Sequence, residues 1–416
     1  MRFIITTLLM LATPLCQADW LDWRGPTTDG HSDATDLPLT WSDTENVAWK
    51  VPIHDFGHST PVVMDGQIWI TAANEDGTKL YAVCLDFNTG KVVHDITVFS
   101  PEKPQRRHPQ NTYATPSVVL EKGRAYVHYG TFGTACIDTD SGKILWTRSD
   151  LHCDHLQGPV ASPVLFEDLL IVHLEGVDVQ YIEALDTKTG DTVWKEDRPH
   201  ELYDDIEPYF FKKSYITPII TKVNGKPQMV SNGSQATIGY NPRTGEEIWR
   251  VVYGGDNSIG RPVQGNGMFF VDCGGIPGSH FLWAVREGGK GDVTDSHVAW
   301  KVDENVAGES SPVLVGDLLY MVAVKGTLTC LEAKTGKVVW EERLSGNYGA
   351  SLLHANGRIY VSSKKGKTIV VQPGRTFKKL AENDLEGGFW ASPAVEGNSL
   401  LLRTETHLYR IQDNQK

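Results

Sequence analysis

The stretch Asp138-Thr139-Asp140-Ser141-Gly142-Lys143-Ile144-Leu145-Trp146 decides the fold, because the chain repeats its pattern. An acidic or amide residue, Thr or Ser, and Gly form a turn, and the apolar residues that end in Trp form a strand. The pattern returns at Asp186 to Trp194, at Asn241 to Trp249 and at Glu332 to Trp340. A pattern that returns in register at this spacing indicates a repeat architecture rather than two or three separate domains.

A second signal marks where each repeat begins. A small residue and Pro precede an apolar strand, as in Ser59-Thr60-Pro61-Val62, and a turn such as Asp65-Gly66 leads into the next strand. The opening residues are Pro61, Pro116, Pro163, Pro218, Pro262, Pro312, Leu352 and Pro393. Openings about 40 to 55 residues apart predict blades of four strands each. We therefore expect an all-β protein, an eight-bladed β-propeller that forms a single domain over residues 19–416.

The repeat also resembles a known family. Cys136 to Trp146 and Ala184 to Trp194 follow the pattern Ala/Cys-x-Asp-x-x-Thr/Ser-Gly-x-x-x-Trp, which is similar to the PQQ-like propeller repeat. That repeat is shared by quinoprotein alcohol dehydrogenases and by BamB-type outer-membrane assembly proteins. The segment Asp22-Trp23-Arg24-Gly25-Pro26 resembles the start of exported PQQ-like proteins. The resemblance implies a propeller that acts as a binding or scaffold module with a protein partner on one rim.

The dehydrogenase branch of this family implies the cofactor PQQ, adjacent cysteines in a vicinal disulfide and a calcium site. No two cysteines are adjacent in this sequence. We therefore expect no cofactor.

The eighth repeat ends without a fourth strand. The segment Asn46 to Lys50, which precedes the first repeat, is similar to His297 to Lys301, a predicted fourth strand. We expect this N-terminal strand to pair with the C-terminal blade and close the ring, which would cover the two sheet edges.

The first 18 residues have the features of a signal peptide. Arg2 is the basic region, Phe3 to Leu15 is the apolar region, and Cys16-Gln17-Ala18 supplies small residues for cleavage after Ala18. A lipoprotein signal is less consistent, because Leu15 stands where a small residue is expected. The apolar run is too short for a transmembrane helix, and no later run reaches that length. We expect a periplasmic or secreted protein.

The charge balance narrows the partners. The chain has 39 Lys and Arg against 52 Asp and Glu, a net charge of −13. This balance argues against nucleic acid as a partner. It leaves open an anionic small molecule held by a few local cations.

The cysteines and tryptophans that recur in the repeat are expected to be structural. Cys84, Cys136 and Cys330 share one repeat position in three blades, too far apart for a disulfide, and behave as small buried apolar residues. A bond between Cys153 and Cys273 is left open. The repeat tryptophans should pack between neighbouring blades: Trp146, Trp194, Trp249, Trp300 and Trp340.

Residues just before each opening should form a ring, because the innermost strands of a propeller converge on a central channel. The residues three positions before the openings are His58, Tyr113, Val160, Tyr215, Ile259, Glu309, Gly349 and Trp390. From these and their neighbours we expect a small polar ligand or glycan to be bound by His58, Tyr113, Lys212, Asp256, Asn257, Glu309, Tyr348 and Trp390. A merely hydrated channel is the alternative.

An enzymatic alternative is elimination at a uronic-acid sugar by a lyase or dehydratase. It needs a cation for the carboxylate, a base for the α-proton and an acid for the leaving oxygen. Arg261 or Lys212, His155, and Tyr215 or Tyr113 would take these roles in that order. The run His152-Cys153-Asp154-His155 contains metal-ligand residue types, but adjacent residues on an extended loop cannot all face one ion. We expect no metal site.

Overall fold

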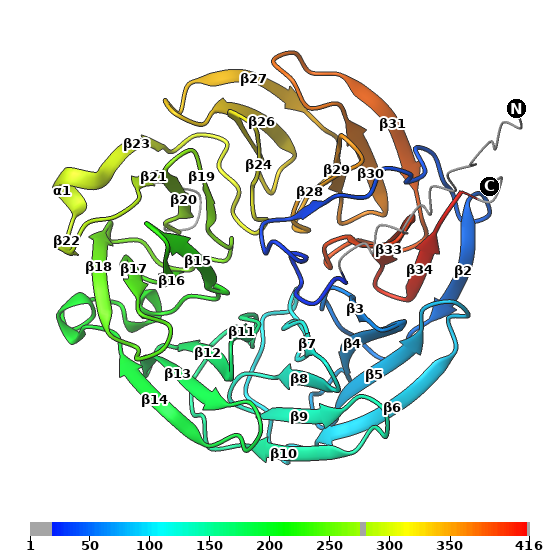
Figure 1. The fold of residues 1–416 in the computed structure, drawn as a ribbon, viewed down its shortest axis with the longest axis horizontal. Helices are drawn as coiled ribbons and strands as arrows, with labels where there is room; N and C mark the ends of the chain where they lie inside the picture. The colour runs from blue at the N-terminus through cyan, green and yellow to red at the C-terminus, as the bar shows by residue number, and fades with distance from the viewer. Residues whose placement is uncertain (1–18, 275–279, 414–416) are drawn as a thin grey trace, which may run out of the picture.

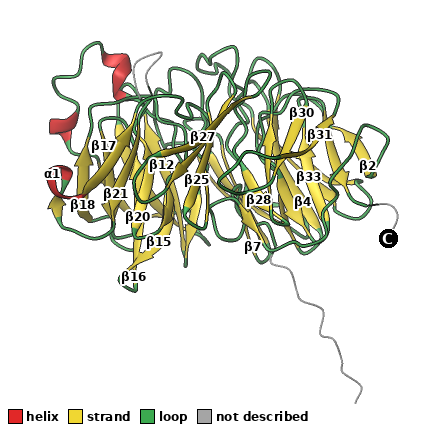
Figure 2. Ribbon diagram, turned by 90° about the horizontal axis from the view of Figure 1, so that it is seen from above, coloured by secondary structure: helices red, strands yellow, loops and turns green. Residues whose placement is uncertain are grey.

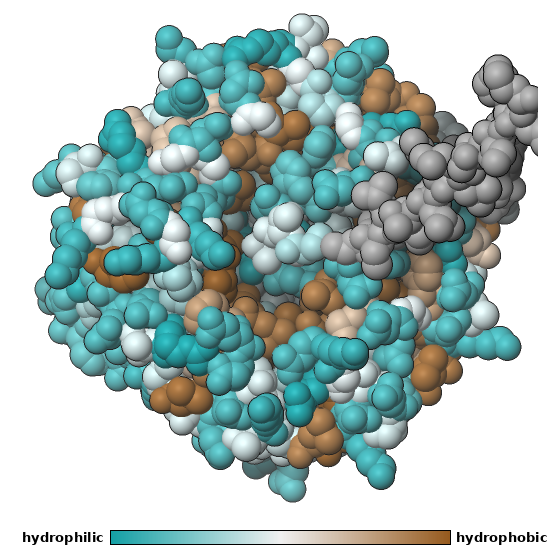
Figure 3. Space-filling view, viewed as in Figure 1, coloured by the Kyte–Doolittle hydropathy of each residue, from teal (hydrophilic) through white to brown (hydrophobic). Residues whose placement is uncertain are grey.

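A computed structural model shows a ring of eight antiparallel blades and describes residues 19–274 and 280–413 (Figure 1). The predicted eight-bladed all-β propeller is confirmed. The expected signal peptide, residues 1–18, lies outside the described residues. No helix among the described residues is long and apolar enough to cross a membrane. On the face seen in Figure 3, hydrophilic residues predominate and apolar ones form separate patches.

Within each blade the strands follow one another outward from the axis, and the blades are numbered 1 to 8 along the chain. The innermost strands are β3 (Val62–Met64), β7 (Val119–Glu121), β11 (Val164–Phe166), β15 (Ile219–Val223), β19 (Val263–Gly265), β24 (Val313–Val315), β28 (Leu353–Ala355) and β32 (Ala394–Glu396). The second strands are β4 (Gln67–Ala73), β8 (Arg124–His128), β12 (Leu169–Glu175), β16 (Lys226–Asn232), β20 (Met268–Asp272), β25 (Leu318–Val322), β29 (Arg358–Ser362) and β33 (Ser399–Arg403). These two sets of strands carry much of the buried core.

The outer half of each blade contains the repeated turn and the strand that follows it. The third strands are β5 (Leu80–Asp86), β9 (Thr134–Asp138), β13 (Gln180–Asp186), β17 (Ala236–Tyr240), β21 (Leu282–Arg286), β26 (Thr327–Glu332), β30 (Lys367–Val371) and β34 (His407–Ile411). The fourth strands are β6 (Val92–Phe99), β10 (Ile144–Arg148), β14 (Thr192–Asp197), β18 (Glu247–Val252), β23 (Val298–Val302), β27 (Val338–Arg343), β31 (Lys379–Asp384) and β2 (Val47–Pro52).

The fourth strand of blade 8 therefore comes from the other end of the chain. β2 pairs antiparallel with β34, with Val51 opposite Leu408 and Lys50 opposite Tyr409. β2 and β34 lie side by side at the right of Figure 1.

A few short elements lie outside the four-stranded pattern. β1 (His31–Ser32) pairs parallel with β28, and β22 (Gly291–Asp292) pairs parallel with β18. One helical turn, α1 (Thr294–His297), follows β22, and the loop between blades 3 and 4 contains η1 (His200–Leu202) and η2 (Tyr209–Lys212). The turns η1 and η2 project from one face of the ring, whereas α1 lies at its outer edge (Figure 2).

The repeat tryptophans pack between blades, as the sequence predicted. Trp146 of blade 2 donates from Nε1 to the carbonyl of Thr187 in blade 3 at 3.1 Å. Its ring lies against Gly190, where φ is +77° and a Cβ would come within 2.7 Å of the indole, so only glycine fits. In blade 1, where His replaces Trp, His94 makes the equivalent contact to the carbonyl of Thr139 at 3.1 Å.

The five described cysteines are free and buried. Cys84, Cys136 and Cys330 have no exposed surface, which confirms their role as packing residues. Cys153 and Cys273 form no bond with each other and belong to separate apolar clusters.

Deleting residues 19–50 should destabilise the whole ring, because it exposes the edge of β34 and removes the outer strand of blade 8. We expect the Tm to fall by about 10 °C or more, since each kcal/mol lost shifts the Tm of a large domain by a few degrees. Calorimetry of the truncated and full-length mature proteins measures the effect. An unchanged Tm would rule out this role for β2.

Candidate functional site

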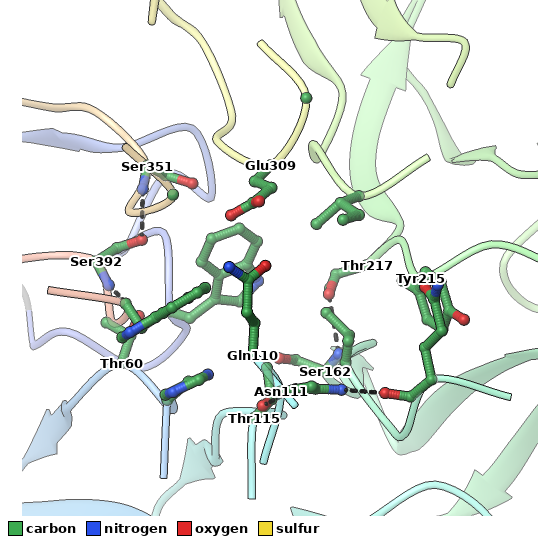
Figure 4. A pocket seen from close by; sticks show the side chains of 18 of the residues that line it. Thr60, Gln110, Asn111, Thr115, Ser162, Tyr215, Thr217, Glu309, Ser351 and Ser392 are labelled. Carbon is green, nitrogen blue, oxygen red and sulfur yellow. Dashed lines mark hydrogen bonds between the residues drawn. The ribbon is translucent and has the colours of Figure 1, made fainter. Parts of the chain in front are cut away.

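The inner ends of the blades enclose a cavity on the ring axis, the axial cavity, with a volume of about 350 Å³. Of the eight residues three positions before the blade openings, all but Tyr113 line it: His58, Val160, Tyr215, Ile259, Glu309, Gly349 and Trp390. Figure 4 shows side chains from blades around the whole ring directed into this space. The cavity has the size of a small-molecule site, for a ligand of one or two sugar rings at most.

One end of the axial cavity is closed by the N-terminal segment, residues 19–32, seen in dark blue across the centre of Figure 1. The carbonyl of Trp20 accepts a hydrogen bond from Val63 of blade 1 at 2.8 Å, and that of Gly30 accepts one from His354 of blade 7 at 2.8 Å. Between these anchors, Trp23 lines the cavity. The channel is therefore a blind pocket with an indole in its floor.

Two buried arginines hold this floor in place. Arg24 donates to the carbonyls of Pro312 in blade 6 at 2.9 Å and Leu352 in blade 7 at 2.5 Å. Burial lowers the pKa of Arg24 to about 10. The guanidinium carbons of Arg24 and Arg261 lie 5.7 and 5.9 Å from the Trp23 ring. Arg24 thus fastens the floor to blades 6 and 7, and Arg261 of blade 5 packs beside it.

Arg261 does not occupy the position expected of a ligand-facing cation. It is 2 % exposed and does not line the axial cavity. Its Nη1 donates to Asp22 at 2.6 Å and its Nε donates to the carbonyl of Pro218 at 3.0 Å. Asp22, far away in the sequence, supplies the buried counter-charge, and the Arg261 side chain lies outside the cavity lining.

His155 and Tyr215 are joined, but not as an acid and a base facing a substrate. The Tyr215 hydroxyl donates to the carbonyl of His155 at 2.7 Å, and burial raises the pKa of Tyr215 well above its usual value. His155 accepts from the amide of Thr131 at 3.1 Å through Nε2, and burial lowers its pKa to about 4. Only the Tyr215 side chain borders the cavity. The structure does not bring the expected catalytic trio together.

The run from His152 to His155 directs its side chains to different partners. His152 pairs with Asp178 at 2.9 Å, while Cys153 lies 3.6 Å from Nδ1 of His155. Among the described residues, no group of three or more His, Cys, Asp or Glu side chains is placed to hold a metal ion.

The best-defined wall of the axial cavity is built around Trp390. Its ring is stacked on His58, with centroids 4.7 Å apart and planes 5° apart. The ammonium of Lys364 lies 3.9 Å from the Trp390 ring centroid and pairs with Glu309 at 2.5 Å. Burial and the positive charges of Arg403 and Lys364 lower the pKa of His58 to about 3, so His58 is neutral at pH 7. This wall, the Trp390 wall, offers an aromatic face beside an ion pair.

Of the eight expected ligand-binding residues, His58, Asn257, Glu309 and Trp390 line the cavity. Asn257 has positive φ (59°), and its Oδ1 is buried without a hydrogen-bond partner among the described residues. The sequence did not predict Lys364 as a site residue, because it follows β29 instead of preceding a blade opening. Its amide donates to the carbonyl of Asn347 at 2.7 Å, which places it beside the opening of its own blade.

The other four expected residues do not line the cavity. The hydroxyls of Tyr113 and Tyr348 donate to local carbonyls, of Gln105 at 2.9 Å and of Ser345 at 3.1 Å. Asp256 forms a buried ion pair with Lys213 at 3.3 Å. Lys212 lies at the end of η2.

A buried network attaches the loop that contains η1 and η2 to the ring. Nε of Arg198 lies 3.2 Å from Glu175, which also accepts from the Tyr203 hydroxyl at 2.5 Å and from the Ser214 hydroxyl. Burial alone would raise the pKa of Glu175, but Arg198, His173 and Ser214 lower it to about 2. The same loop reaches the cavity wall, because the amide of Asn257 donates to the carbonyl of Lys213 at 2.9 Å.

These features define a class: an eight-bladed propeller with a blind polar and aromatic cavity on its axis. The family model described as outer membrane protein assembly factor BamB matches residues 105–288 and, in an overlapping second match, residues 236–380. The chain belongs to this family of PQQ-like propellers.

Curated relatives in the same family match shorter parts of the chain. A protein named outer membrane protein assembly factor BamB from Burkholderia pseudomallei is 27 % identical over 27 % of this chain and 29 % of its own length. The protein of that name from Yersinia pestis is 21 % identical over 41 % of each chain. The matched region thus spans less than half of either relative.

Solved structures share the fold. BamB from Moraxella catarrhalis superposes with a TM-score of 0.60 at 12 % identity, over 88 % of this chain and 99 % of that chain. A quinohemoprotein alcohol dehydrogenase from Comamonas testosteroni gives 0.66 at 13 % identity, over 96 % and 81 %. At these identities the likeness concerns the fold alone.

Glu175→Gln should destabilise the protein at pH 7 by roughly 3–5 kcal/mol, because it leaves Arg198 as an unpaired buried charge. The folded-state pKa of Glu175, about 2, lies below its ordinary value of 4.5. Its contribution is therefore complete above pH 4.5 and is lost as the pH falls toward 2. Urea denaturation from pH 7 to pH 3 should show the gap between wild type and variant narrowing.

The control is Glu201→Gln on the same loop. Glu201 pairs with Arg250 at 2.8 Å but its side chain is 68 % exposed, so the change should cost under about 1 kcal/mol. Equal losses in the two variants would contradict a special role for the buried pair.

Proposed function

We propose that this protein is a binding propeller of the cell envelope whose axial cavity holds a small polar ligand, a carbohydrate unit among the candidates. The observation that carries the proposal is the combination of a blind cavity, the Trp23 floor and the Trp390 wall. A channel that only held water would not need an indole fastened across it by two buried arginines.

The chemistry of the cavity suits a ring-shaped polar molecule. Trp23 and the stacked rings of His58 and Trp390 offer apolar aromatic surface against which a sugar ring can pack. Asn257, Gln110 and Gln157 add amide groups that can both donate and accept hydrogen bonds. The volume of about 350 Å³ limits the ligand to a small molecule or to one end of a longer chain.

We further propose a protein partner on the rim that carries η1 and η2. The relatives are named for outer-membrane protein assembly, and the signal-peptide features of the sequence favour export. On this rim, Tyr209 and Phe210 of η2 are 54 % and 39 % exposed. Exposed aromatic side chains on a projecting loop are typical of protein-binding surfaces.

Trp390→Ala should abolish ligand binding in the axial cavity, because it removes the ring that the wall is built on. The measurement is a thermal-shift screen of mono- and disaccharides, sugar acids included, followed by titration of each hit. A bound ligand stabilises the folded state in proportion to ln(1 + [L]/Kd), so a lost hit appears as a lost Tm increase.

Lys212→Ala is the matched control, since Lys212 lies on η2 and does not line the cavity. Lys212→Ala should show the same ligand-induced increases in Tm as the wild type. A hit that survives Trp390→Ala at full strength would place the ligand elsewhere and count against this site.

Phe210→Ser should weaken capture of a partner from envelope extract, because it removes an exposed aromatic group from the projecting rim. Phe56→Ser, which changes a phenylalanine that is 48 % exposed elsewhere on the ring, serves as the control. Pull-down with quantitative mass spectrometry compares the three proteins. Recovery of no β-barrel assembly components by the wild type would remove a role in that assembly.

A further inference from the structure

A series of seven hydrogen bonds runs around the axial cavity from blade to blade and is interrupted once, between blades 4 and 5. In each bond a backbone N–H at the opening of one blade donates to a side-chain hydroxyl at the opening of the next, at 2.9 to 3.1 Å. The accepting hydroxyls, which we call the hydroxyl ring, belong to Thr60, Ser117, Ser162, Thr217, Ser311, Ser351 and Ser392. Figure 4 shows five of them spaced around the cavity.

These hydroxyls are left with protons to donate. Each oxygen accepts one N–H, and no hydroxyl of the ring donates to an acceptor within the described part of the chain. A Ser or Thr hydroxyl carries one donor proton whose direction is free to adjust. All of the ring except Ser311 lines the cavity. The lower part of the cavity therefore presents six O–H donors.

The floor adds a donor of another kind. Nε1 of Trp23 is buried and has no hydrogen-bond partner among the residues described. An indole N–H can only donate a hydrogen bond, so it needs an acceptor, and no described residue supplies one. Behind this ring lie the buried guanidinium groups of Arg24 and Arg261. Neither of these arginines lines the cavity.

The six hydroxyl donors of the ring, with the two buried arginines next to the floor, match a ligand rich in acceptors. A carboxylate has about four lone-pair sites and no donor when ionised, and charge-assisted bonds to it are roughly twice as strong as neutral ones. Each hydroxyl of an uncharged sugar carries a donor proton of its own, so it accepts fewer hydrogen bonds from these donors than a carboxylate does.

We infer that the hydroxyl ring and the Trp23 indole form an oxyanion subsite, which binds the anionic group of a sugar acid or another small ligand. This inference rests on the proposed ligand-binding function and names the class of ligand. The Trp390 wall then contacts the less polar remainder of the molecule. A carboxylate, a sulfate and a phosphate share the chemistry that the subsite recognises.

The decisive comparison is Ser351→Ala against Ser311→Ala in the otherwise intact mature chain. Both variants lose one inter-blade hydrogen bond of the same type, of 2.9 Å for Ser351 and 2.9 Å for Ser311. Only Ser351 faces the cavity. We expect similar falls in Tm but different effects on binding.

Isothermal titration with D-glucuronate, D-glucose, inorganic sulfate and inorganic phosphate supplies the binding data. Glucuronate should bind the wild type at least about tenfold more tightly than glucose, and Ser351→Ala should weaken glucuronate by about tenfold, which is the loss of one charge-assisted bond. Ser311→Ala should change it by less than about twofold. Binding of sulfate or phosphate but not glucuronate would assign the subsite to those anions.

Trp23→Phe tests the floor without disturbing the ring of bonds, since Nε1 makes none. The variant should weaken glucuronate binding about tenfold and leave the Tm unchanged within a few degrees. Equal binding of glucose and glucuronate, lost together in Trp390→Ala, would overturn the oxyanion subsite while leaving the ligand-binding function in place. No binding of any sugar or anion would overturn both.

Discussion

The inter-blade hydrogen bonds of the hydroxyl ring are the constraint on which the rest of the structure depends. Each fixes the opening of one blade to the next, and the series is broken at one place only, between Thr217 of blade 4 and Arg261 of blade 5. Here Arg261 has no hydroxyl to offer, and its Nε reaches back to the carbonyl of Pro218 instead. The same guanidinium draws in Asp22. One irregular residue in the repeat thereby fastens the N-terminal segment across the axis and turns a channel into a cavity.

Contacts at the outer edge complement this inner ring. In five of the eight blades the repeat Trp or His donates to a carbonyl in the turn of the next blade, as Trp49 does to Phe87 and Trp300 to Ala333. Both sets of contacts join only neighbouring blades, as is usual in repeat architectures. This is why the sequence predicted the fold well: the residues that form the blades and those that join them recur at fixed positions. Seven of the eight residues three positions before the openings line the cavity, because position in the repeat determines distance from the axis.

The sequence could not predict the residues that depend on contacts outside the repeat. Trp23 lies in a segment that belongs to no blade, and nothing local shows that it crosses the axis. Arg261 occupies a cavity-facing repeat position, yet its buried partner Asp22 is far away in the chain. His155 and Asp256 precede openings as expected, but each is paired with a nearby group. His155 accepts a hydrogen bond from a backbone amide, and Asp256 forms an ion pair with a lysine. In each case a long-range or buried pairing overrides the direction that the repeat position alone suggests.

The hydroxyl ring would serve folding and binding with the same atoms. An oxygen that accepts an N–H from the neighbouring blade becomes more polarised, and its proton becomes a better donor to an anion in the cavity. Conversely, an anion held by six such protons would strengthen the acceptors that join the blades. Ligand binding and the stability of the ring are then coupled, because a ligand that binds only the folded state stabilises that state. A propeller built in this way would report the presence of its ligand across all the blades that the ring connects, including the blade 3 to blade 4 loop that carries the proposed partner surface.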